Sequence, residues 1–138
     1  MDRELIAEKL ESLRRCVARI EAKCPATVAL LVADPDVQDI IAINLQRAIQ
    51  LCVDIGAHLI AESEAPAPVT MGETFEGLVA ANVIPAALGE RLRKAVGLRN
   101  IAVHSYAAID WAIVHAVCTT RLPDFSEFAQ AISSRLSR

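Results

Sequence analysis

Residues 99–106, Arg-Asn-Ile-Ala-Val-His-Ser-Tyr, bring together a permanent cation, an imidazole and a phenol. The guanidinium of Arg99 offers a rigid fork of donors that matches phosphate oxygens, and the imidazole of His104 titrates near neutral pH. Such a pair can stabilise charge on a phosphate and move a proton, and neither group needs a metal. The segment therefore indicates a site for phosphodiester chemistry.

The spacing of these residues limits how one helix can present them. On a regular α-helix Arg99 and Tyr106 lie within about 20° of one face, whereas His104 points about 140° away from Arg99. Either the helix distorts or ends between Val103 and Asp110, which lets His104 turn, or a second copy of the protein supplies the missing partner. Both alternatives predict a site at a helix end or at a dimer interface.

The elements that must position this segment are expected to be helices. Apolar residues spaced by three and four, caps and prolines predict six helices that begin near Asp2, Asp34, Thr70, Pro85, Asp110 and Pro123. The first should end at Cys24 and the second at about Glu62. Thr70 with Glu73, and Asp124 with Glu127, match capping boxes. The apolar residues 26–33 fit either a loop or an extension of a helix.

Composition indicates the same fold class. Hydrophobic residues make up 54% of the 138 residues but aromatic residues only 4%, so the core must consist mainly of Ala, Leu, Ile and Val. No alternating strand pattern competes, and no repeat divides the chain. We therefore expect an all-α protein with a single domain over residues 1–138, folded as one antiparallel bundle of about five to six helices.

The bulk properties exclude several functions. No apolar run approaches the ~20 residues of a membrane span, and the first residues do not resemble a signal peptide, which predicts a cytoplasmic protein. The four cysteines form no C-x-x-C pair and no zinc-finger spacing, so we expect reduced thiols, no metal and no cofactor. No P-loop, G-x-S-x-G elbow or H-E-x-x-H motif is present.

The net charge of −3 is unusual for a protein that acts on nucleic acid. Contact with RNA is therefore expected only at a local basic patch, for which the candidates are Arg91, Arg93, Lys94 and Arg99.

The Arg-x4-His-x-Tyr pattern, with Asn100 directly after the arginine, resembles the signature of the HEPN superfamily and in particular of its HepT-like toxins. Residues 88–98 and 45–55 resemble the neighbouring helices of that family, so the resemblance covers nearly the whole chain. It implies a HEPN-like fold and a homodimeric, metal-independent endoribonuclease with Arg99 and His104 in its active site.

The resemblance also implies an RNA substrate and a nucleotidyltransferase antitoxin of the MNT type as partners. In HepT-like proteins the tyrosine of the motif receives AMP from that enzyme, and Tyr106 matches this position. An AMP group there would place a negative phosphodiester beside Arg99, where it would obstruct the site and compete for the cation.

A polar stripe on the second predicted helix borders its apolar face and consists of Asn44, Arg47, Asp54 and His58. It fits hydrogen-bonded packing or a solvated edge, or else a shell that orients the motif. In the second case Asp54 would hold Arg99 or His104, and Asn100 is a further supporting residue. His115 fits a surface or packing role.

Two alternative functions remain open. A non-catalytic helical module could bind a nucleotidyltransferase or a nucleotide through Arg99, and the acidic net charge favours this reading. A purely structural dimer is the third alternative.

Overall fold

The computed structural model describes residues 2–137 of the chain. Within this part the structure has seven α-helices and one 3₁₀ turn: α1 (Arg3–Lys23), α2 (Val28–Val32), α3 (Pro35–Ala61), α4 (Met71–Ala80), α5 (Ala86–His104), η1 (Tyr106–Ala108), α6 (Trp111–Thr120) and α7 (Pro123–Leu136). The all-α class is confirmed, and the six predicted helices are all present. The segment left open between loop and helix contains the short helix α2.

Most helices begin where a side chain can accept the first free backbone N–H groups. Asp2, Asp34 and Asp110 accept backbone N–H groups at the starts of α1, α3 and α6. Thr70 and Glu73 form the predicted capping box of α4. These local hydrogen bonds explain why the predicted boundaries agree with the structure.

The predicted capping box of the last helix is wrong. Helix α7 begins at Pro123, whose fixed φ suits the first helical position, and the preceding Leu122 has no side chain that can cap it. The carboxylates of Asp124 and Glu127 bind Arg91 of α5 instead, at 2.9 and 3.2 Å. Charged hydrogen bonds to a guanidinium thus replace the expected bonds to backbone N–H groups.

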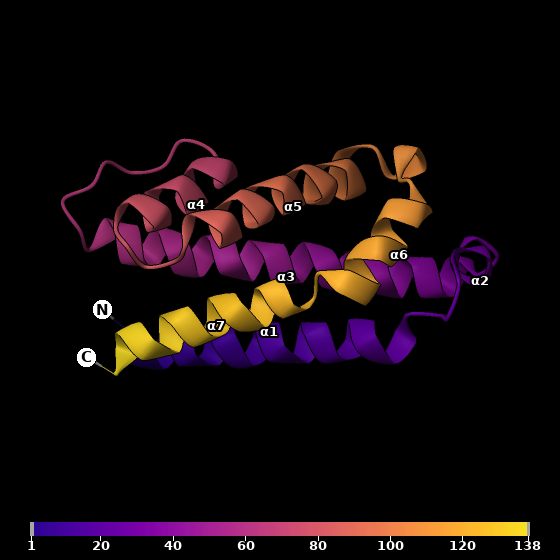
Figure 1. Cartoon of the computed structure of the whole chain (residues 1–138), viewed down its shortest axis with the longest axis horizontal. Helices are drawn as coiled ribbons and strands as arrows, with labels where there is room; N and C mark the ends of the chain where they lie inside the picture. Colours follow the sequence, from indigo (N-terminus) through magenta and orange to yellow (C-terminus); the bar gives the residue numbers. More distant parts are fainter. Residues whose placement is uncertain (1, 138) are drawn as a thin grey trace.

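The long helices α1, α3, α5 and α7 run along one long axis with alternating direction, whereas α2 and α6 lie at one end of the bundle (Figure 1). α1 packs along α3, α4 packs against α5, and α7 contacts both α1 and α5, while α2 packs against α6. Both termini lie at one end of the bundle, and the carboxyl end of α5 lies near the opposite end, beside α6. The segment from Arg99 to Tyr106 is therefore placed far from the termini.

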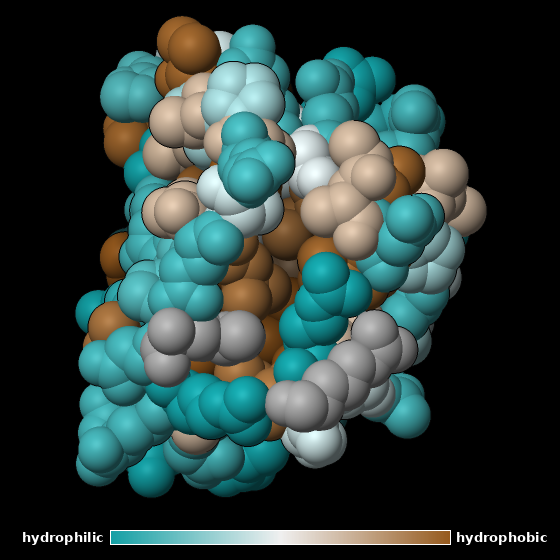
Figure 2. Space-filling view, turned by 90° about the vertical axis from the view of Figure 1, so that its left-hand side faces the viewer, coloured by the Kyte–Doolittle hydropathy of each residue, from teal (hydrophilic) through white to brown (hydrophobic). Residues whose placement is uncertain are grey.

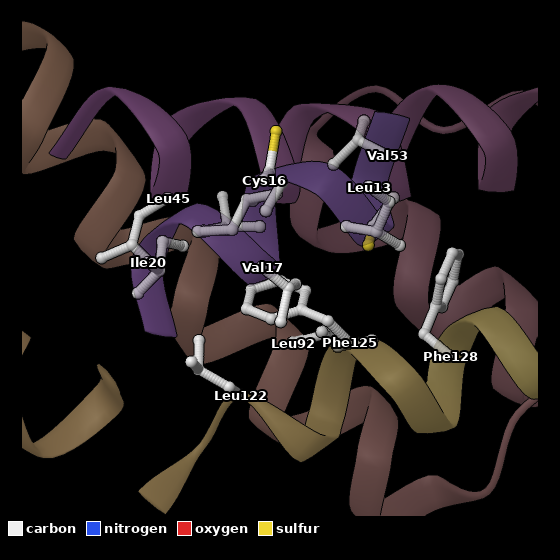
Figure 3. Close-up of a cluster of buried hydrophobic side chains, with 14 of the residues drawn as sticks. Leu13, Cys16, Val17, Ile20, Leu45, Val53, Leu92, Leu122, Phe125 and Phe128 are labelled. Carbon is white, nitrogen blue, oxygen red and sulfur yellow. The ribbon is translucent and has the colours of Figure 1, made fainter. Parts of the chain in front are cut away.

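The core is mainly aliphatic, as the composition predicts, and three phenylalanines complete it. Val17 of α1, Leu92 of α5 and Phe125 of α7 belong to one buried cluster (Figure 3). The rings of Phe75 and Phe128 meet edge to face with centroids 6.3 Å apart. At the end where the termini lie, hydrophilic residues surround a hollow lined by hydrophobic ones (Figure 2).

The central helix α3 is long and apolar enough to cross a membrane by length and composition alone, but 56% of its apolar window is buried inside the bundle. That burial is typical of a core helix. The four cysteines are free thiols, as expected, and burial raises the pKa of Cys16 and raises that of Cys118 to about 12. These thiols therefore stay protonated at neutral pH.

Candidate active site

The carboxyl end of α5 decides how the motif residues are presented. The helix remains regular through His104, and Ser105 leaves it with φ −145° and ψ 51°. The end falls inside the predicted window between Val103 and Asp110, but one residue too late to turn His104. Because His104 follows Arg99 by five helical steps of about 100° each, its side chain points about 140° away from that of Arg99. The end of α5 at Ser105 therefore changes the direction of Tyr106, which begins the 3₁₀ turn, within one chain. The side chain of His104 keeps the direction that a regular helix gives it.

Arg99 is half-buried and is held by two neutral side chains. Its Nη2 donates to Oε1 of Gln50 at 3.1 Å, and its Nη1 donates to Oδ1 of Asn100 at 3.2 Å. Neither acceptor cancels the positive charge, and each terminal nitrogen keeps a second N–H for another acceptor. Its buried Nε has no hydrogen-bond partner within residues 2–137. The guanidinium is thus oriented but not neutralised.

Gln50 connects Arg99 to Asp54. The Nε2 of Gln50 donates to Oδ1 of Asp54 at 2.8 Å, and Oδ2 of Asp54 lies 3.8 Å from Nζ of Lys9. Asp54 therefore reaches Arg99 only through Gln50, whereas Asn100 contacts it directly. Gln50 was not singled out by the sequence, although its position four residues before Asp54 places both on one face of α3.

If Arg99 serves the RNA cleavage expected from the sequence, Gln50→Leu should slow that cleavage by about 10- to 100-fold, because Arg99 then loses an acceptor that orients its guanidinium. Leucine has a similar volume but cannot accept the hydrogen bond. The rate of cleavage of a labelled RNA measures the effect, and circular dichroism checks the fold. The matched control is Gln130→Leu on the exposed face of α7, and a wild-type rate for Gln50→Leu would contradict the positioning role.

His104 is exposed at the last position of α5. Within residues 2–137 its side chain makes no hydrogen bond and no ion pair. Both ring nitrogens are therefore available to a substrate, as a general acid or base requires.

Tyr106 lies between α3 and the start of α6. Its Oη donates to Oδ1 of Asp39 at 2.5 Å, and its ring meets that of Trp111 edge to face with centroids 5.8 Å apart. Burial, together with the carboxylate of Asp39, raises the pKa of Tyr106 to about 12. The hydroxyl is therefore protonated at neutral pH, and the residue as a whole is 40% exposed.

The expected basic patch is largely neutralised. Arg91 pairs with Asp124 and Glu127, and Arg93 and Lys94 lie within 4.0 Å of Glu90. Arg99 is the one member of the predicted set that has no carboxylate partner within residues 2–137. Carboxylates on the same helix and on α7 thus reduce the positive charge that three of the four candidates present.

A groove of about 410 Å³ between α1 and α3 offers a different basic surface. It is lined by Arg15, Arg19 and Arg47, and also by Gln50, which holds Arg99. Arg15 pairs with Glu11, whereas no carboxylate in the described part of the chain pairs with Arg19 or Arg47. The groove thus places two arginines without an ion pair in residues 2–137, together with the carboxylate of Asp54, beside the residue that holds Arg99.

The predicted polar stripe of α3 divides between two places. Asn44, Arg47 and Asp54 line the α1–α3 groove, and the buried Oδ1 of Asn44 has no partner within residues 2–137. His58 lies further along, where its Nε2 accepts from the backbone N–H of Asp2 at 3.4 Å.

His115 has the packing role expected of it, since its Nε2 lies 2.8 Å from the carbonyl oxygen of Pro25. Among residues 2–137 no three His, Cys, Asp or Glu side chains gather as metal ligands would.

A family model described as "Ribonuclease HepT-like" matches residues 8–132. The chain belongs to the HepT-like ribonuclease family. It is 33% identical over 131 residues to the mRNA nuclease HepT of Shewanella oneidensis, a match that covers 95% of this chain and 98% of that protein. The resemblance to HepT-like members of the HEPN superfamily, and with it the expected ribonuclease activity, is confirmed.

Solved structures agree with the HEPN-like fold. The chain superposes with a TM-score of 0.89 on the tri-AMPylated HEPN toxin of Shewanella oneidensis in complex with its MNT antitoxin, with 33% identity over 97% of this chain and 99% of that one. A toxin–antitoxin crystal structure with AMP-PNP gives a TM-score of 0.89 and 32% identity over 95% of this chain and 98% of that one.

Proposed function

We propose that this HepT-like chain is the toxin of a toxin–antitoxin pair and cleaves RNA without a metal, with Arg99 and His104 as its catalytic residues. His104 takes the proton of a ribose 2′-hydroxyl or gives one to the leaving oxygen, and Arg99 stabilises the charge that grows on the phosphate. The observation that carries the proposal is the environment of the Arg99 guanidinium. The neutral side chains of Gln50 and Asn100 orient it without cancelling its charge. The neighbouring Arg91 and Lys94, in contrast, pair with carboxylates.

The active site is proposed to form between two copies, each a single domain of residues 1–138. His104 points away from Arg99 on the same helix, so a second copy is needed to bring an imidazole to that guanidinium. A homodimer also supplies two imidazoles across one cleft, one as acid and one as base. Light scattering should show a dimer at micromolar concentration, and a monomer would contradict this arrangement.

RNA is proposed to enter along the α1–α3 groove. Arg19 and Arg47 lie there without carboxylate partners in residues 2–137, and Gln50 links the groove to Arg99. Such a local surface attracts phosphates even though the whole chain carries a net charge of −3.

The proposed partner is a cognate nucleotidyltransferase antitoxin of the MNT type, which transfers AMP to Tyr106 in the cytoplasm. The similar Shewanella oneidensis toxin is tri-AMPylated and bound to an MNT antitoxin. Tyr106 is 40% exposed, and it begins the 3₁₀ turn that follows the helix bearing Arg99, directly after Ser105. A phosphodiester on this hydroxyl obstructs the RNA site and offers Arg99 a competing anion.

A second candidate function is a non-catalytic module that binds a nucleotidyltransferase or a nucleotide through Arg99. The pairing of Arg91, Arg93 and Lys94 with carboxylates favours it, because little cationic surface is left on α5 for RNA.

Arg99→Lys separates the two functions. A lysine preserves a point charge that can anchor a phosphate, but it loses the planar fork that contacts two oxygens of a transition state. Loss of RNA cleavage with retained antitoxin binding is expected for the nuclease. Binding without any cleavage by the wild-type protein would favour the non-catalytic module.

A further inference from the structure

Asp39 is an exposed residue near the start of α3 that no sequence motif singles out. Its Oδ1 accepts the hydrogen bond of the Tyr106 hydroxyl at 2.5 Å. The contact joins residues 67 positions apart, and within residues 2–137 Asp39 makes no other hydrogen bond and no ion pair. The carboxylate thus contacts the oxygen that receives AMP in the function proposed above.

Tyr106 needs a proton acceptor if it is to react at neutral pH. With a pKa of about 12 its hydroxyl stays protonated, and a protonated phenol is a weak nucleophile. Enzymes that transfer phosphoryl groups to hydroxyls meet the same need with an aspartate that accepts the hydroxyl proton. The carboxylate of Asp39 already occupies the corresponding position.

We propose that Asp39 is the general base for AMP transfer to Tyr106, so that the toxin supplies the proton acceptor for its own modification. This inference rests on the proposed function, which makes Tyr106 the acceptor. Oη of Tyr106 attacks the α-phosphorus of ATP and a new O–P bond forms. The bond from that phosphorus to the bridging oxygen of the β-phosphate breaks, pyrophosphate leaves with the electron pair, and the phenolic proton passes to Asp39.

The same step alters the contact that made it possible. Once AMP is attached, Oη carries no proton and the hydrogen bond to Asp39 is lost. The new phosphodiester is negative and is repelled by the carboxylate, which favours movement of the modified side chain away from Asp39.

Asp39→Asn tests the proposal, because the amide oxygen still accepts a hydrogen bond but cannot take the proton. Purified wild-type and variant proteins are incubated with the cognate nucleotidyltransferase and Mg-ATP between pH 7 and 9, and intact mass reports the rate of the first AMP addition. At pH 7 the variant should be about 10²- to 10³-fold slower. Its rate should rise about tenfold per pH unit as the phenolate fraction grows, whereas the wild-type rate stays flat.

A merely structural role would slow the variant without changing this pH profile, and it would overturn the proposal. The matched control is Asp36→Asn, which removes the same charge one turn earlier on the exposed face of α3 and should behave as the wild type. If wild-type Tyr106 receives no AMP, the AMP-transfer part of the proposed function fails together with this inference. If it receives AMP and Asp39→Asn matches its rate at pH 7, only the inference about Asp39 fails.

An independent readout uses the single tyrosine of the chain. Ultraviolet titration of the purified protein should show the Tyr106 phenol ionising near pH 12. Asp39→Asn should lower the midpoint by the part of the shift that the carboxylate causes, while the larger part, which burial causes, remains. An unchanged midpoint would show that Asp39 does not act on the hydroxyl and would overturn the proposal.

Discussion

His104→Ala is expected to lower the rate of RNA cleavage by about 10²- to 10⁴-fold, the usual contribution of a general acid or base. The imidazole is exposed and makes no hydrogen bond or ion pair within residues 2–137, so the fold does not depend on it. The cleavage rate of a labelled RNA and the helical circular dichroism should be measured on the same preparation. A fall in rate with unchanged dichroism is the expected result.

The matched control is His58→Ala, which removes a histidine near the carboxyl end of α3 that contacts the backbone N–H of Asp2. This variant should cleave RNA at the wild-type rate. If His104→Ala also keeps the wild-type rate, His104 takes no part in proton transfer and the proposed site is wrong.

Tyr106→Phe is expected to abolish AMP addition completely. Phenylalanine keeps the ring that packs on Trp111 but has no oxygen to attack a phosphate. When wild-type protein is co-expressed with the cognate nucleotidyltransferase, intact mass should increase by one or more AMP units and growth inhibition should be relieved. The variant should show no increase in mass and should remain toxic beside the same enzyme, provided that cleavage does not need the hydroxyl.

Cleavage by purified Tyr106→Phe is the control that makes the growth result interpretable. A variant that cleaves RNA at the wild-type rate shows that the hydroxyl serves modification alone. If co-expressed wild-type protein carries no added nucleotide, regulation through Tyr106 is excluded, and the antitoxin would have to act by covering the site.

Local signals explain how much of the fold was predictable. Asp34, Thr70 and Asp110 cap helices as expected because a cap depends only on a few neighbouring residues. The start of α7 at Pro123 was predicted correctly, but its capping box was not, because Asp124 binds Arg91, 33 positions away in the chain. No local pattern reports a contact over that distance.

The site was predictable by residue type but not by its contacts. Arg99, His104 and Tyr106 were selected by their chemistry and spacing, whereas Gln50 and Asp39 were missed because they reach the motif from 49 and 67 positions away. Part of the ion pairing beside Arg99 was predictable, since Glu90 and Lys94 are spaced as an ion pair on one helix. The pairing of Arg91 with α7 required the tertiary structure.

The chemistry of the cleaved ends tests the central claim most directly. Wild-type protein should cleave RNA in excess EDTA and leave a 2′,3′-cyclic phosphate or a 3′-phosphate, because the ribose 2′-hydroxyl itself attacks the phosphorus with the help of His104 and Arg99. Mass spectrometry of the products identifies these ends. Cleavage that strictly requires added magnesium and leaves a 3′-hydroxyl would contradict the proposed mechanism.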